Sequence, residues 1–485
     1  MELPVPRRTK IVATLGPATD SPQVLHALLS AGVDVVRLNF SHGGAAAQRK
    51  RATAVREAAA ELGRDIAILA DLQGPKIRIG GFADGPVQLS EGQSFALDTA
   101  LADDAGTAEQ VGVTYADLPR DVAPGDSLLL NDGLIVMTVE AVDGSRIDCR
   151  VEIGGTLSDH KGINRQGGGL TARALTDKDR ADIKTVAELE ADYVAISFPR
   201  DADDMHTARE LLAGAGSRAG VIAKIERAEA LTHLDAIISA SDAVMIARGD
   251  LAVEIGDAEL ASVQKHIIHR ARELNRVVIT ATQMMESMIQ QPAPTRAEVL
   301  DVANAVMDGT DAVMLSAETA AGRYPVKTVQ AMARVCVGAE KHRVTQRSRH
   351  RIGGHFERTD EAIAMAAMYT ANHFNIRAII ALTESGSTPL WMSRIRSGIP
   401  IYGLSAHAES RRRMALYRGV YAVPFDIQHT HPNNVIHDAT ETLRARGAVD
   451  TGDLVVTTKG DFTGVAGGTN ALKIVVVGEV VTFND

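Results

Sequence analysis

The sequence predicts an α/β protein: a (β/α)8 TIM barrel with an inserted β-rich lid domain and a C-terminal α/β domain. Short apolar runs alternate with amphipathic helical segments, which implies parallel strands joined by right-handed crossovers. Eight such runs precede residue 343, the number that closes a barrel. An open doubly wound sheet is the alternative. The eight expected strands are Lys10–Leu15, Asp34–Asn39, Ile66–Leu72, Tyr193–Phe198, Val221–Glu226, Ala243–Arg248, Val277–Thr282 and Ala312–Ala317.

Helical patterns between these strands cover Gln48–Leu62, Asp177–Leu189, Leu260–Leu274 and Arg296–Met307. Aromatic residues make up only 4% of the chain, so small and branched aliphatic residues must fill the core. Such a composition suits parallel strands buried between helices. With 485 residues, the chain is long enough for about three domains.

The alternation stops after the third strand. Residues 74–169 have no long helical period and contain short β-like runs such as Ser127–Leu130 and Leu134–Val139. We therefore expect a catalytic barrel made of residues 1–73 and 170–343, interrupted by a β-rich domain at 74–169. Barrel enzymes build their sites at the carboxyl ends of the strands, so a domain inserted there can act as a lid.

A second alternation of strands and helices follows a basic, polar linker at Lys341–Arg351. It predicts a separate, smaller α/β domain over residues 344–485. Its expected helices are Asp360–Asn372, Thr388–Ser397, Glu409–Tyr417 and Asn433–Arg444, and its expected strands are Arg377–Leu382, Pro400–Leu404, Asp453–Thr457 and Leu472–Val477.

The overall composition excludes several classes of protein. A formal net charge of -10 argues against nucleic-acid binding, which needs a basic surface. The two cysteines, Cys149 and Cys336, are too far apart in sequence to indicate a disulfide framework or a cysteine metal site. The first ten residues lack the apolar core of a signal peptide, and no apolar run reaches about 18 residues. We expect a cytoplasmic enzyme with neither a nucleic-acid nor a membrane partner.

Polar residues at the ends of the second and third strands indicate a phosphate site. Arg37, Asn39 and Ser41 recur every second residue and could share one face, where Arg can fork onto a phosphate. A polar strand end that caps the next helix is an equal alternative. After the third strand, the carboxylate of Asp71 precedes a Gly-Pro turn and two cations, Lys76 and Arg78. The alternative there is a solvated hairpin with surface charges.

The fifth and sixth strands end in a combination typical of metal-dependent phosphoryl transfer. Lys224 and Glu226 share one face of their strand, and Asp250 follows the next strand. Two carboxylates suit Mg²⁺ or Mn²⁺, and a nearby Lys supplies positive charge for a transferring phosphoryl group. The amides of Gly249 and Asp250 could bind a small carboxylate. Structural ion pairs are the alternative.

The last two strands offer hydroxyls. Thr282 can donate a proton or a hydrogen bond to a developing enolate. Ser316 and Glu318 could join a proton relay, but helix capping explains them equally well.

Five segments in chain order resemble pyruvate kinases, and the resemblance runs over essentially the whole chain. They are Thr9–Pro17 (TKIVATLGP), Arg37–Gly43 (RLNFSHG), Lys224–Glu226 (KIE), Ala247–Leu251 (ARGDL) and Ala281–Met288 (ATQMMESM).

The resemblance implies transfer of a phosphoryl group from phosphoenolpyruvate to ADP, giving pyruvate and ATP in glycolysis. Glu226 and Asp250 would bind Mg²⁺, with Mn²⁺ as an alternative. Lys224 would stabilise the phosphoryl group, and Thr282 would lie on the protonation path of the enolate. The remaining substrate site would comprise Arg37, Asn39, Ser41, Asp71 and Gly249, and the nucleotide site Arg78, Lys161, Pro17 and His42.

Two positions depart from the common family pattern. Many members carry an acidic residue where this chain has Lys76, and they need K⁺ beside Asn39, Ser41, Asp71 and Leu72. The chain resembles the K⁺-independent branch, because the Lys76 ammonium can substitute for the monovalent cation. We therefore expect no K⁺ requirement. Arg165 and Gln166 replace a common Leu-Pro pair at the hinge of the lid.

The loop Thr383–Thr388 follows an apolar strand and opens a helix, which favours an anion site. A plain helix cap is the alternative. The loop is similar to the family's sugar-phosphate effector loop, so we expect Thr383, Ser385, Gly386, Ser387 and Thr388 to bind a phosphorylated allosteric effector. The Gly-rich run Gly460–Gly468 would flank the same pocket. By resemblance, the protein would be a homotetramer.

Two other functions remain open. A metal-dependent barrel lyase or aldolase acting on pyruvate would also use a Glu and an Asp, but it would not need Lys224, the lid or the C-terminal domain. A metabolite sensor that lost turnover would not need the full set of charged residues.

Overall fold

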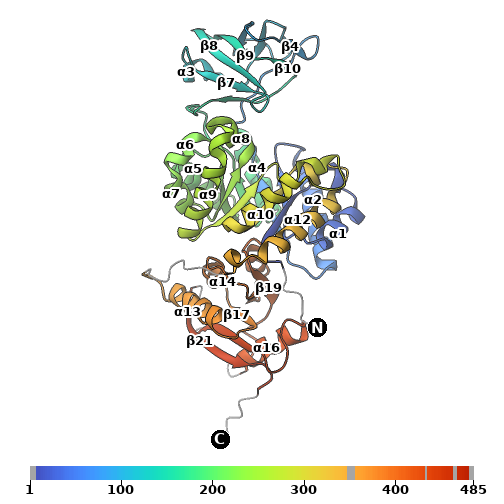
Figure 1. Cartoon of the computed structure of the whole chain (residues 1–485), viewed down its shortest axis with the longest axis vertical. Helices are drawn as coiled ribbons and strands as arrows, with labels where there is room; N and C mark the ends of the chain where they lie inside the picture. Colours follow the sequence, from blue (N-terminus) through green and yellow to red (C-terminus); the bar gives the residue numbers. More distant parts are fainter. Residues whose placement is uncertain (1–6, 347–354, 432–433, 462–466, 480–485) are drawn as a thin grey trace.

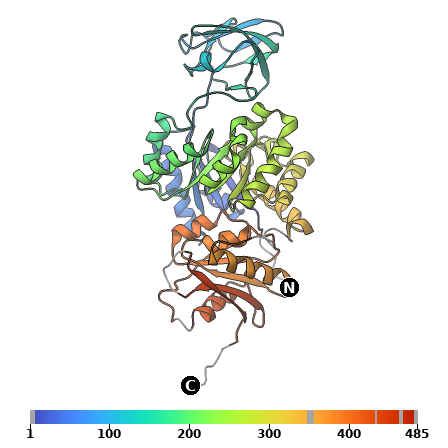
Figure 2. The ribbon, with the colours of Figure 1, turned by 90° about the vertical axis from the view of Figure 1, so that its left-hand side faces the viewer.

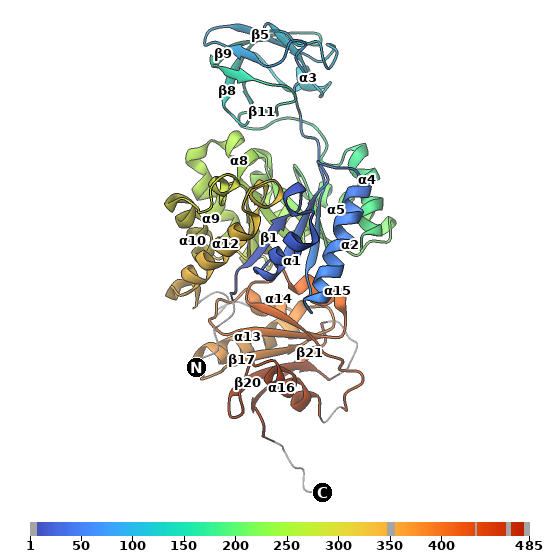
Figure 3. The same ribbon diagram turned by 90° about the vertical axis from the view of Figure 1, so that its right-hand side faces the viewer.

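The structure is a computed structural model that describes residues 7–346, 355–431, 434–461 and 467–479. Three layers follow one another along the long axis of the molecule (Figure 1). A β-rich region lies at one end, a barrel lies in the middle, and an α/β domain lies at the other end. The two side views keep this order (Figure 2, Figure 3).

The middle layer is a closed barrel of eight parallel strands, which confirms the predicted fold class and excludes the open sheet. β1 closes the barrel by pairing with both β2 and β16. In spatial order the strands are β1 (Lys10–Thr14), β2 (Val35–Asn39), β3 (Ala67–Asp71), β12 (Tyr193–Ile196), β13 (Gly220–Ile225), β14 (Ala243–Ala247), β15 (Val277–Ala281) and β16 (Ala312–Leu315).

Helices surround the barrel and bury their apolar faces against it. The α-helices are α1 (Pro22–Ser30), α2 (Ala45–Glu61), α4 (Asp177–Glu188), α5 (Ala202–Gly214), α6 (Ala228–Thr232), α7 (Leu234–Ala240), α8 (Arg248–Ile255), α9 (Asp257–Glu273), α10 (Arg296–Asp308), α11 (Ala317–Ala320) and α12 (Pro325–Glu340). Short 3-10 helices are η1 (Pro17–Thr19), η2 (Glu286–Ile289) and η3 (Arg343–Thr345).

Several strands end earlier than their apolar runs predict. Arg248 begins α8, and Phe198 and Thr282 leave the strand with φ of 56° and 69°. Residues with side chains rarely adopt such a backbone. These turns occur where the chain bends over the carboxyl end of the barrel.

An aspartate precedes every second barrel strand and anchors the strand before it. In each case one carboxylate oxygen accepts a backbone N–H, so four pairs of neighbouring strands are joined in the same way. The four bonds run from Ile11 to Asp34 (2.9 Å), from Ile68 to Asp192 (2.8 Å), from Val221 to Asp242 (2.7 Å) and from Val278 to Asp311 (2.9 Å).

The β-rich region follows the carboxyl end of β3 and has its own apolar core. Its main sheet has six strands in the order β11-β7-β8-β9-β5-β6, beside a two-stranded sheet, β10-β4. The elements are β4 (Val87–Leu89), β5 (Ser94–Asp98), β6 (Gln110–Gly112), α3 (Leu118–Asp121), β7 (Ser127–Leu130), β8 (Ile135–Asp143), β9 (Arg146–Ile153), β10 (Gly155–Leu157) and β11 (Ile163–Arg165).

The C-terminal α/β domain has a five-stranded sheet in the order β19-β18-β17-β20-β21, and β21 alone is antiparallel to its neighbour. Its elements are α13 (Thr359–His373), β17 (Ala378–Leu382), α14 (Ser387–Ser393), β18 (Ile401–Ser405), α15 (Ala408–Met414), β19 (Val420–Pro424), α16 (Val435–Ala445), β20 (Leu454–Gly460) and β21 (Thr469–Val476). Of the predicted segments, residues 347–351 of the linker, Asn433 and residues 462–466 of the Gly-rich run lie outside the described residues.

This domain packs against the amino ends of the barrel strands. Lys10 Nζ donates to the carbonyl of Val420 at 2.6 Å, and the Tyr193 hydroxyl donates to the carbonyl of Arg413 at 2.8 Å. One apolar cluster runs from the inside of the barrel into the domain. The opposite, carboxyl end of the barrel therefore faces the β-rich region. Within the described residues, no helix combines the length and apolar character needed to cross a membrane.

Candidate active site

Three strand ends bring a compact charge network together at the carboxyl end of the barrel. Arg37 Nε lies 2.6 Å from Oδ2 of Asp71, across the neighbouring strands β2 and β3. Lys224 Nζ, from β13, lies 3.3 Å from Oδ1 of the same carboxylate and 2.9 Å from Oε1 of Glu226. Two cations therefore converge on Asp71, and the second also contacts Glu226.

Burial makes this network electrostatically strong. Asp71 and Glu226 are only 1% and 2% exposed. Burial alone would raise the pKa of Asp71, but the Arg37 guanidinium and the Lys224 ammonium hold that pKa below its usual value. Burial likewise opposes the charged form of Lys224, yet Asp71 and Glu226 raise its pKa. Lys224 is therefore held as a cation facing the open end of the barrel.

Glu226 follows β13 and Asp250 lies in the first turn of α8; these are the two carboxylates that the sequence predicts to bind a metal. The pKa of Glu226 is raised by burial and by the charge of Asp250, although Lys224 opposes the shift. Glu226 Oε2 accepts from the amide of Phe198 at 2.9 Å, and Asp250 Oδ1 lies 3.1 Å from Lys76 Nζ. No group of three or more His, Cys, Asp or Glu suited to a metal occurs in the described part of the chain.

Ser197 belongs to the network but was not found by sequence reasoning. Its hydroxyl accepts from Lys224 Nζ at 2.7 Å and donates to the carbonyl of Leu72 at 2.7 Å. It thereby fixes the position of the Lys224 ammonium. Its location was the signal that could have identified it: Ser197 directly follows β12, the fourth barrel strand, at the carboxyl end of the barrel.

Thr282 lies beside the start of α8. Its hydroxyl accepts from the amide of Gly249 at 2.9 Å and donates to the carbonyl of Ala281 at 2.6 Å. The Gly249 amide, which sequence reasoning assigned to a substrate carboxylate, is therefore bonded to Thr282 in this structure. An incoming carboxylate would have to take over that bond.

Arg78 and Lys161 meet where the β-rich region joins the barrel. Arg78 Nη1 donates to the carbonyl of His160 at 2.9 Å, and Arg78 pairs across a β-bridge with Gly162. The carbonyl of Lys161 accepts from the amide of Ile79 at 2.9 Å. Two of the four predicted nucleotide contacts, Arg78 and Lys161, thus lie on the chain segments that connect the region to the barrel.

The other predicted contacts lie at the ends of β1 and β2. Pro17 opens η1, and Asn39 Oδ1 accepts from the amide of Ser41 at 3.0 Å. The carbonyl of His42 accepts from Gln48 Nε2 at 2.8 Å. Among the described residues, no hydrogen bond joins Pro17 or His42 to the connecting segments, and none joins Lys76 to Asn39 or Ser41.

The predicted effector loop lines a cavity in the C-terminal domain. The amide of Gly386, whose φ is 84°, donates to Oγ1 of Thr383 at 2.9 Å. Thr388 Oγ1 lies 2.8 Å from Thr469 Oγ1. The space, counted together with the solvent at its mouth, is about 510 Å³, and the centre of a water molecule can move within about 40 Å³ of it. Thr383, Glu384, Ser387, Thr388 and Gly467–Thr469 line it together with apolar residues, and the described lining contains no Arg or Lys.

The known proteins that this chain resembles are pyruvate kinases, and the similarity extends over nearly the whole chain. The family model for the pyruvate kinase barrel domain matches residues 6–329, and the model for the pyruvate kinase alpha/beta domain matches residues 361–475. Pyruvate kinase II of Salmonella typhimurium is 55% identical over 97% of this chain and 99% of the relative. Pyruvate kinase of Haemophilus influenzae is 53% identical, covering 94% and 96%.

A solved structure agrees with these relatives. A pyruvate kinase from Cryptosporidium parvum superposes with a TM-score of 0.90 at 33% identity, covering 97% of this chain and 96% of that one. The resemblance seen in the sequence motifs is thereby confirmed. The chain belongs to the pyruvate kinase family and is a transferase.

Proposed function

We propose that this chain transfers the phosphoryl group of phosphoenolpyruvate to ADP and releases pyruvate and ATP. The reaction would be an ATP-forming step of glycolysis in the cytoplasm. The observation that carries the proposal is the position of Lys224. Its ammonium is held between two buried carboxylates at the open end of the barrel, with Arg37 beside it. A fixed cation at this point stabilises negative charge that accumulates on a phosphoryl group in transit.

Arg37 and Arg78 supply the phosphate contacts in this proposal. Arg37 Nε donates to the Asp71 carboxylate, and Arg37 Nη1 donates to Oγ1 of Thr14 at 3.1 Å. These two hydrogen bonds fix the plane of the guanidinium. A fixed Arg fork loses little freedom when it binds a phosphate. Asp71, together with Asn39 and Ser41, orients the cations around the substrate.

Glu226 and Asp250 are proposed to hold a divalent metal, Mg²⁺ or alternatively Mn²⁺; the family needs a divalent metal. The fit rests on their chemistry: both offer hard carboxylate oxygens. Burial, with the charge of Asp250, raises the pKa of Glu226, and a bound cation would relieve both effects. Two protein ligands leave room for substrate oxygens and water. When bound, the metal supplies charge neutralisation on the phosphate and enolate oxygens.

The hydroxyl of Thr282 is proposed to lie on the path by which the enolate gains its proton. It already accepts a hydrogen bond from the Gly249 amide and donates one to the Ala281 carbonyl. A rotation of one hydroxyl would release the Gly249 amide, which with that of Asp250 would bind the substrate carboxylate. The same movement would turn the Thr282 proton toward the substrate.

We also propose the division into a barrel (1–73 and 170–343), a lid (74–169) and a regulatory domain (344–485). The lid would carry the nucleotide with Arg78 and Lys161, while Pro17 and His42 contact it from the barrel. Because Arg78 and Lys161 lie on the connecting segments, any rotation of the lid moves both of them.

The cavity beside Thr383–Thr388 is proposed to bind a phosphorylated effector. Hydroxyls of Thr383, Ser387 and Thr388 and the amides at the start of α14 would receive the phosphate, and Ser385 and Gly386 shape the turn. The protein would assemble as a homotetramer and would not require K⁺.

One assay tests the main proposal. Pyruvate formation is followed with phosphoenolpyruvate and Mg²⁺, with and without ADP. We expect pyruvate to form only when ADP is present. We expect the rate of its formation to fall by about 10²-fold or more in Lys224→Gln. The exposed Lys184→Gln serves as the matched control. Pyruvate release without ADP would favour a lyase, and the absence of turnover in the folded wild type would favour a sensor.

A further inference from the structure

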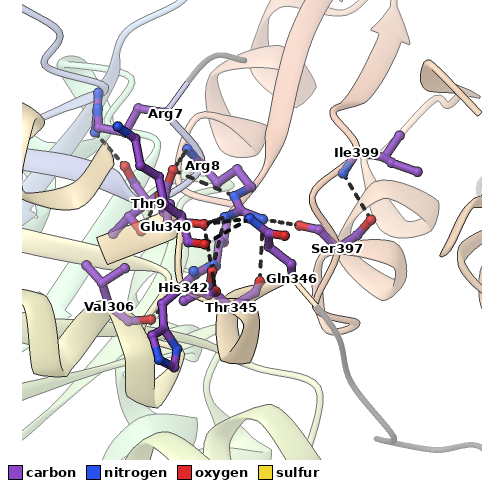
Figure 4. Close-up of polar contacts among 12 residues, drawn as sticks. Arg7, Arg8, Thr9, Val306, Glu340, His342, Thr345, Gln346, Ser397 and Ile399 are labelled. Carbon is purple, nitrogen blue, oxygen red and sulfur yellow. Dashed lines mark hydrogen bonds and ion pairs between the residues drawn. The ribbon is translucent and has the colours of Figure 1, made fainter. Parts of the chain in front are cut away.

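Four arginines line a small cavity between the barrel and the C-terminal domain. Arg8 precedes β1 and Arg272 lies in the last turn of α9, so both belong to the barrel. Arg396 follows α14 and Arg418 precedes β19, so both belong to the C-terminal domain. Figure 4 shows the Arg8 side of this junction, with Glu340 and Thr345 on one side and Ser397 on the other. We call these four residues the junction arginines.

Most of their hydrogen bonds go to uncharged groups. Arg8 donates to the carbonyls of Ser397 and Glu340. The other three arginines likewise use main-chain carbonyls, which satisfy N–H groups without neutralising charge. These bonds run from Arg272 to Arg394 (3.1 Å), from Arg396 to Val344 (2.8 Å) and Asp308 (2.6 Å), and from Arg418 to Val306 (3.0 Å) and Thr310 (2.9 Å).

The junction carries more positive than negative charge. Glu340 faces Arg8, with Oε2 at 3.6 Å from Nε. In the described ranges, no carboxylate lies within 4.0 Å of the guanidinium of Arg272, Arg396 or Arg418. The two nearby aspartates pair with other cations, Asp311 with Arg394 (2.9 Å between Oδ2 and Nη1) and Asp308 with Lys265 (2.5 Å from Oδ1). Oδ2 of Asp308 has no hydrogen-bond partner among the described residues.

The pKa values agree with this imbalance. Burial, followed by the charges of Arg396 and Arg394, lowers the pKa of Arg272 to about 9. Burial lowers that of Arg418 to about 10, with Arg8 and Arg396 adding to the effect against Glu340 and Asp311. Buried like charges repel one another and are costly unless a counter-charge is present.

Two of these guanidinium groups have a buried N–H without a partner among the described residues: Nη2 of Arg418 and Nε of Arg396. Arg418 itself is only 9% exposed. At Gly309, whose φ is 106°, an added Cβ would lie 2.9 Å from Nη1 of Arg272 and 2.9 Å from Nη2 of Arg396. Guanidinium groups from both domains thus converge on one point of the backbone that glycine keeps open.

We propose that the junction arginines bind a small inorganic oxyanion, phosphate or one of its size, that bridges the barrel and the C-terminal domain. Arg forks match the tetrahedral oxygens of phosphate, and the anion would give the unpartnered N–H groups acceptors. The centre of a water molecule can move within about 20 Å³ of the cavity, enough for one or two waters. The space admits only a small ligand, so the proposal is limited to the free anion.

This site differs from the proposed effector cavity. The two cavities share no lining residue, and the effector cavity is lined by hydroxyls and glycines where the junction is lined by arginines. The junction anion therefore does not depend on the proposed effector, and the two proposals can fail separately.

Thermal unfolding of the full chain tests the proposal. Inorganic phosphate is titrated in a buffer whose only other anion is gluconate. We expect a saturable rise in Tm, and an apparent Kd for phosphate weakened by about tenfold or more in Arg272→Gln and in Arg418→Gln, since each loses a charge-assisted hydrogen bond. The exposed Arg120→Gln in the β-rich region is the matched control. The catalytic site and the proposed effector cavity are unchanged in all variants. A difference in apparent Kd for phosphate between a junction variant and the control therefore measures binding at the junction.

The phosphate-free condition provides a second readout. Without a counter-anion the cations repel one another, so Arg272→Gln should melt at or above the wild-type Tm and fall below it at saturating phosphate. A merely structural arginine would lower Tm equally in both conditions, and that result would overturn the proposal. This readout needs Arg272→Gln alone, so it stands if Arg418→Gln does not fold.

Anomalous diffraction from crystals grown with selenate locates the anion. A selenium peak within hydrogen-bond distance of Arg272 and Arg418, lost in Arg272→Gln, supports the proposal. Water alone at the junction, at a selenate concentration that saturates the rise in Tm, contradicts it. So does a peak held by one exposed arginine only, which would be an adventitious ion.

Discussion

Lys76 Nζ lies 3.1 Å from Oδ1 of Asp250, so the cation that begins the β-rich region is paired with a candidate metal ligand. Glu226 has its own partner in Lys224, at 2.9 Å. Each carboxylate of the proposed metal site therefore carries one lysine. The two differ in burial, since the side chain of Lys76 is 28% exposed and that of Lys224 only 11%. In the proposed division of domains, Lys76 belongs to the lid and Lys224 to the barrel.

Replacing Lys76 should create a dependence on K⁺. In a buffer free of Na⁺ and K⁺, we expect the Lys76→Gln rate to fall by about 10²-fold, because one positive charge near the transferring group is lost. Added K⁺ should restore part of that rate and should change the wild-type rate little. Steady-state rates with a Tris-buffered substrate measure both, and Lys184→Gln is the control. Strong K⁺ activation of the wild type would contradict the assignment.

Glu254 connects α8, the helix that carries Asp250, to the segment after the β-rich region, and its pKa is raised to about 7. Oε2 accepts from the amide of Ala228 at 2.8 Å, and its carbonyl accepts from the amide of Gly167 at 2.9 Å. Burial, with the charge of Glu229, raises its pKa to about 7 against the opposing effects of the Ala228 amide and Arg227. Glu254 is therefore largely protonated in the folded protein below pH 7.

The sign of the pH effect follows from that shift. A carboxyl whose folded pKa exceeds its unfolded value contributes stability at low pH and loses it as pH rises from about 4.5 to 7. The shift corresponds to about 3 kcal/mol as an order of magnitude. We expect hydrogen exchange at the Gly167 amide, corrected for intrinsic pH dependence, to indicate easier opening from pH 5 to 8.

Glu254→Gln should flatten this pH dependence, because glutamine keeps the shape and does not titrate. The exposed Glu57→Gln should leave it as in the wild type. A profile in Glu254→Gln with the same slope as the wild type would show that another group is responsible.

Arg394 and Asp311 form a buried ion pair between the two domains, with side chains 1% and 2% exposed. Arg394→Met leaves the Asp311 carboxylate buried without its cation. Two backbone amides still donate to it, Val278 N at 2.9 Å and Arg418 N at 3.4 Å. Breaking such a pair costs about 3–5 kcal/mol. We expect the double variant with Asp311→Asn to recover part of that loss.

Chemical denaturation of the two single variants and the double variant measures this coupling. The exposed pair Arg120 and Asp117, at 85% and 54%, is the matched control, and its coupling should stay below about 1 kcal/mol. Equal coupling in the two pairs would mean that burial does not set the strength of the domain contact.

Much of the barrel could be predicted because its pattern is local. Apolar runs such as Ala67–Asp71 mark buried strands, and polar residues after them mark the carboxyl end of the barrel. Period 2 placed Lys224 and Glu226 on one face, and their 2.9 Å contact follows from it.

Contacts between distant segments could not be predicted in this way. Lys76 and Asp250 are 174 residues apart, and their contact depends on how the β-rich region sits on the barrel. Ser197 was missed because a single serine after an apolar run also fits an ordinary strand end. The junction arginines lie on four separate segments, and only the packing of two domains brings them together.

A carboxylate placed in the proposed effector cavity should abolish the proposed activation by sugar phosphates and leave catalysis unchanged. Ser387 begins α14 and lines the cavity near Glu384, so Ser387→Glu adds a second negative charge where a phosphate would bind. The added carboxylate would repel the phosphate. It would also accept hydrogen bonds from the backbone amides at the start of α14, which the phosphate would otherwise use. We expect sugar phosphates to lose their effect on the phosphoenolpyruvate saturation curve, while kcat at saturating substrate stays at the wild-type value. The exposed Thr451→Glu, in the same domain, should respond to effectors like the wild type. A wild type whose saturation curve is hyperbolic and unmoved by any sugar phosphate would refute the effector assignment itself.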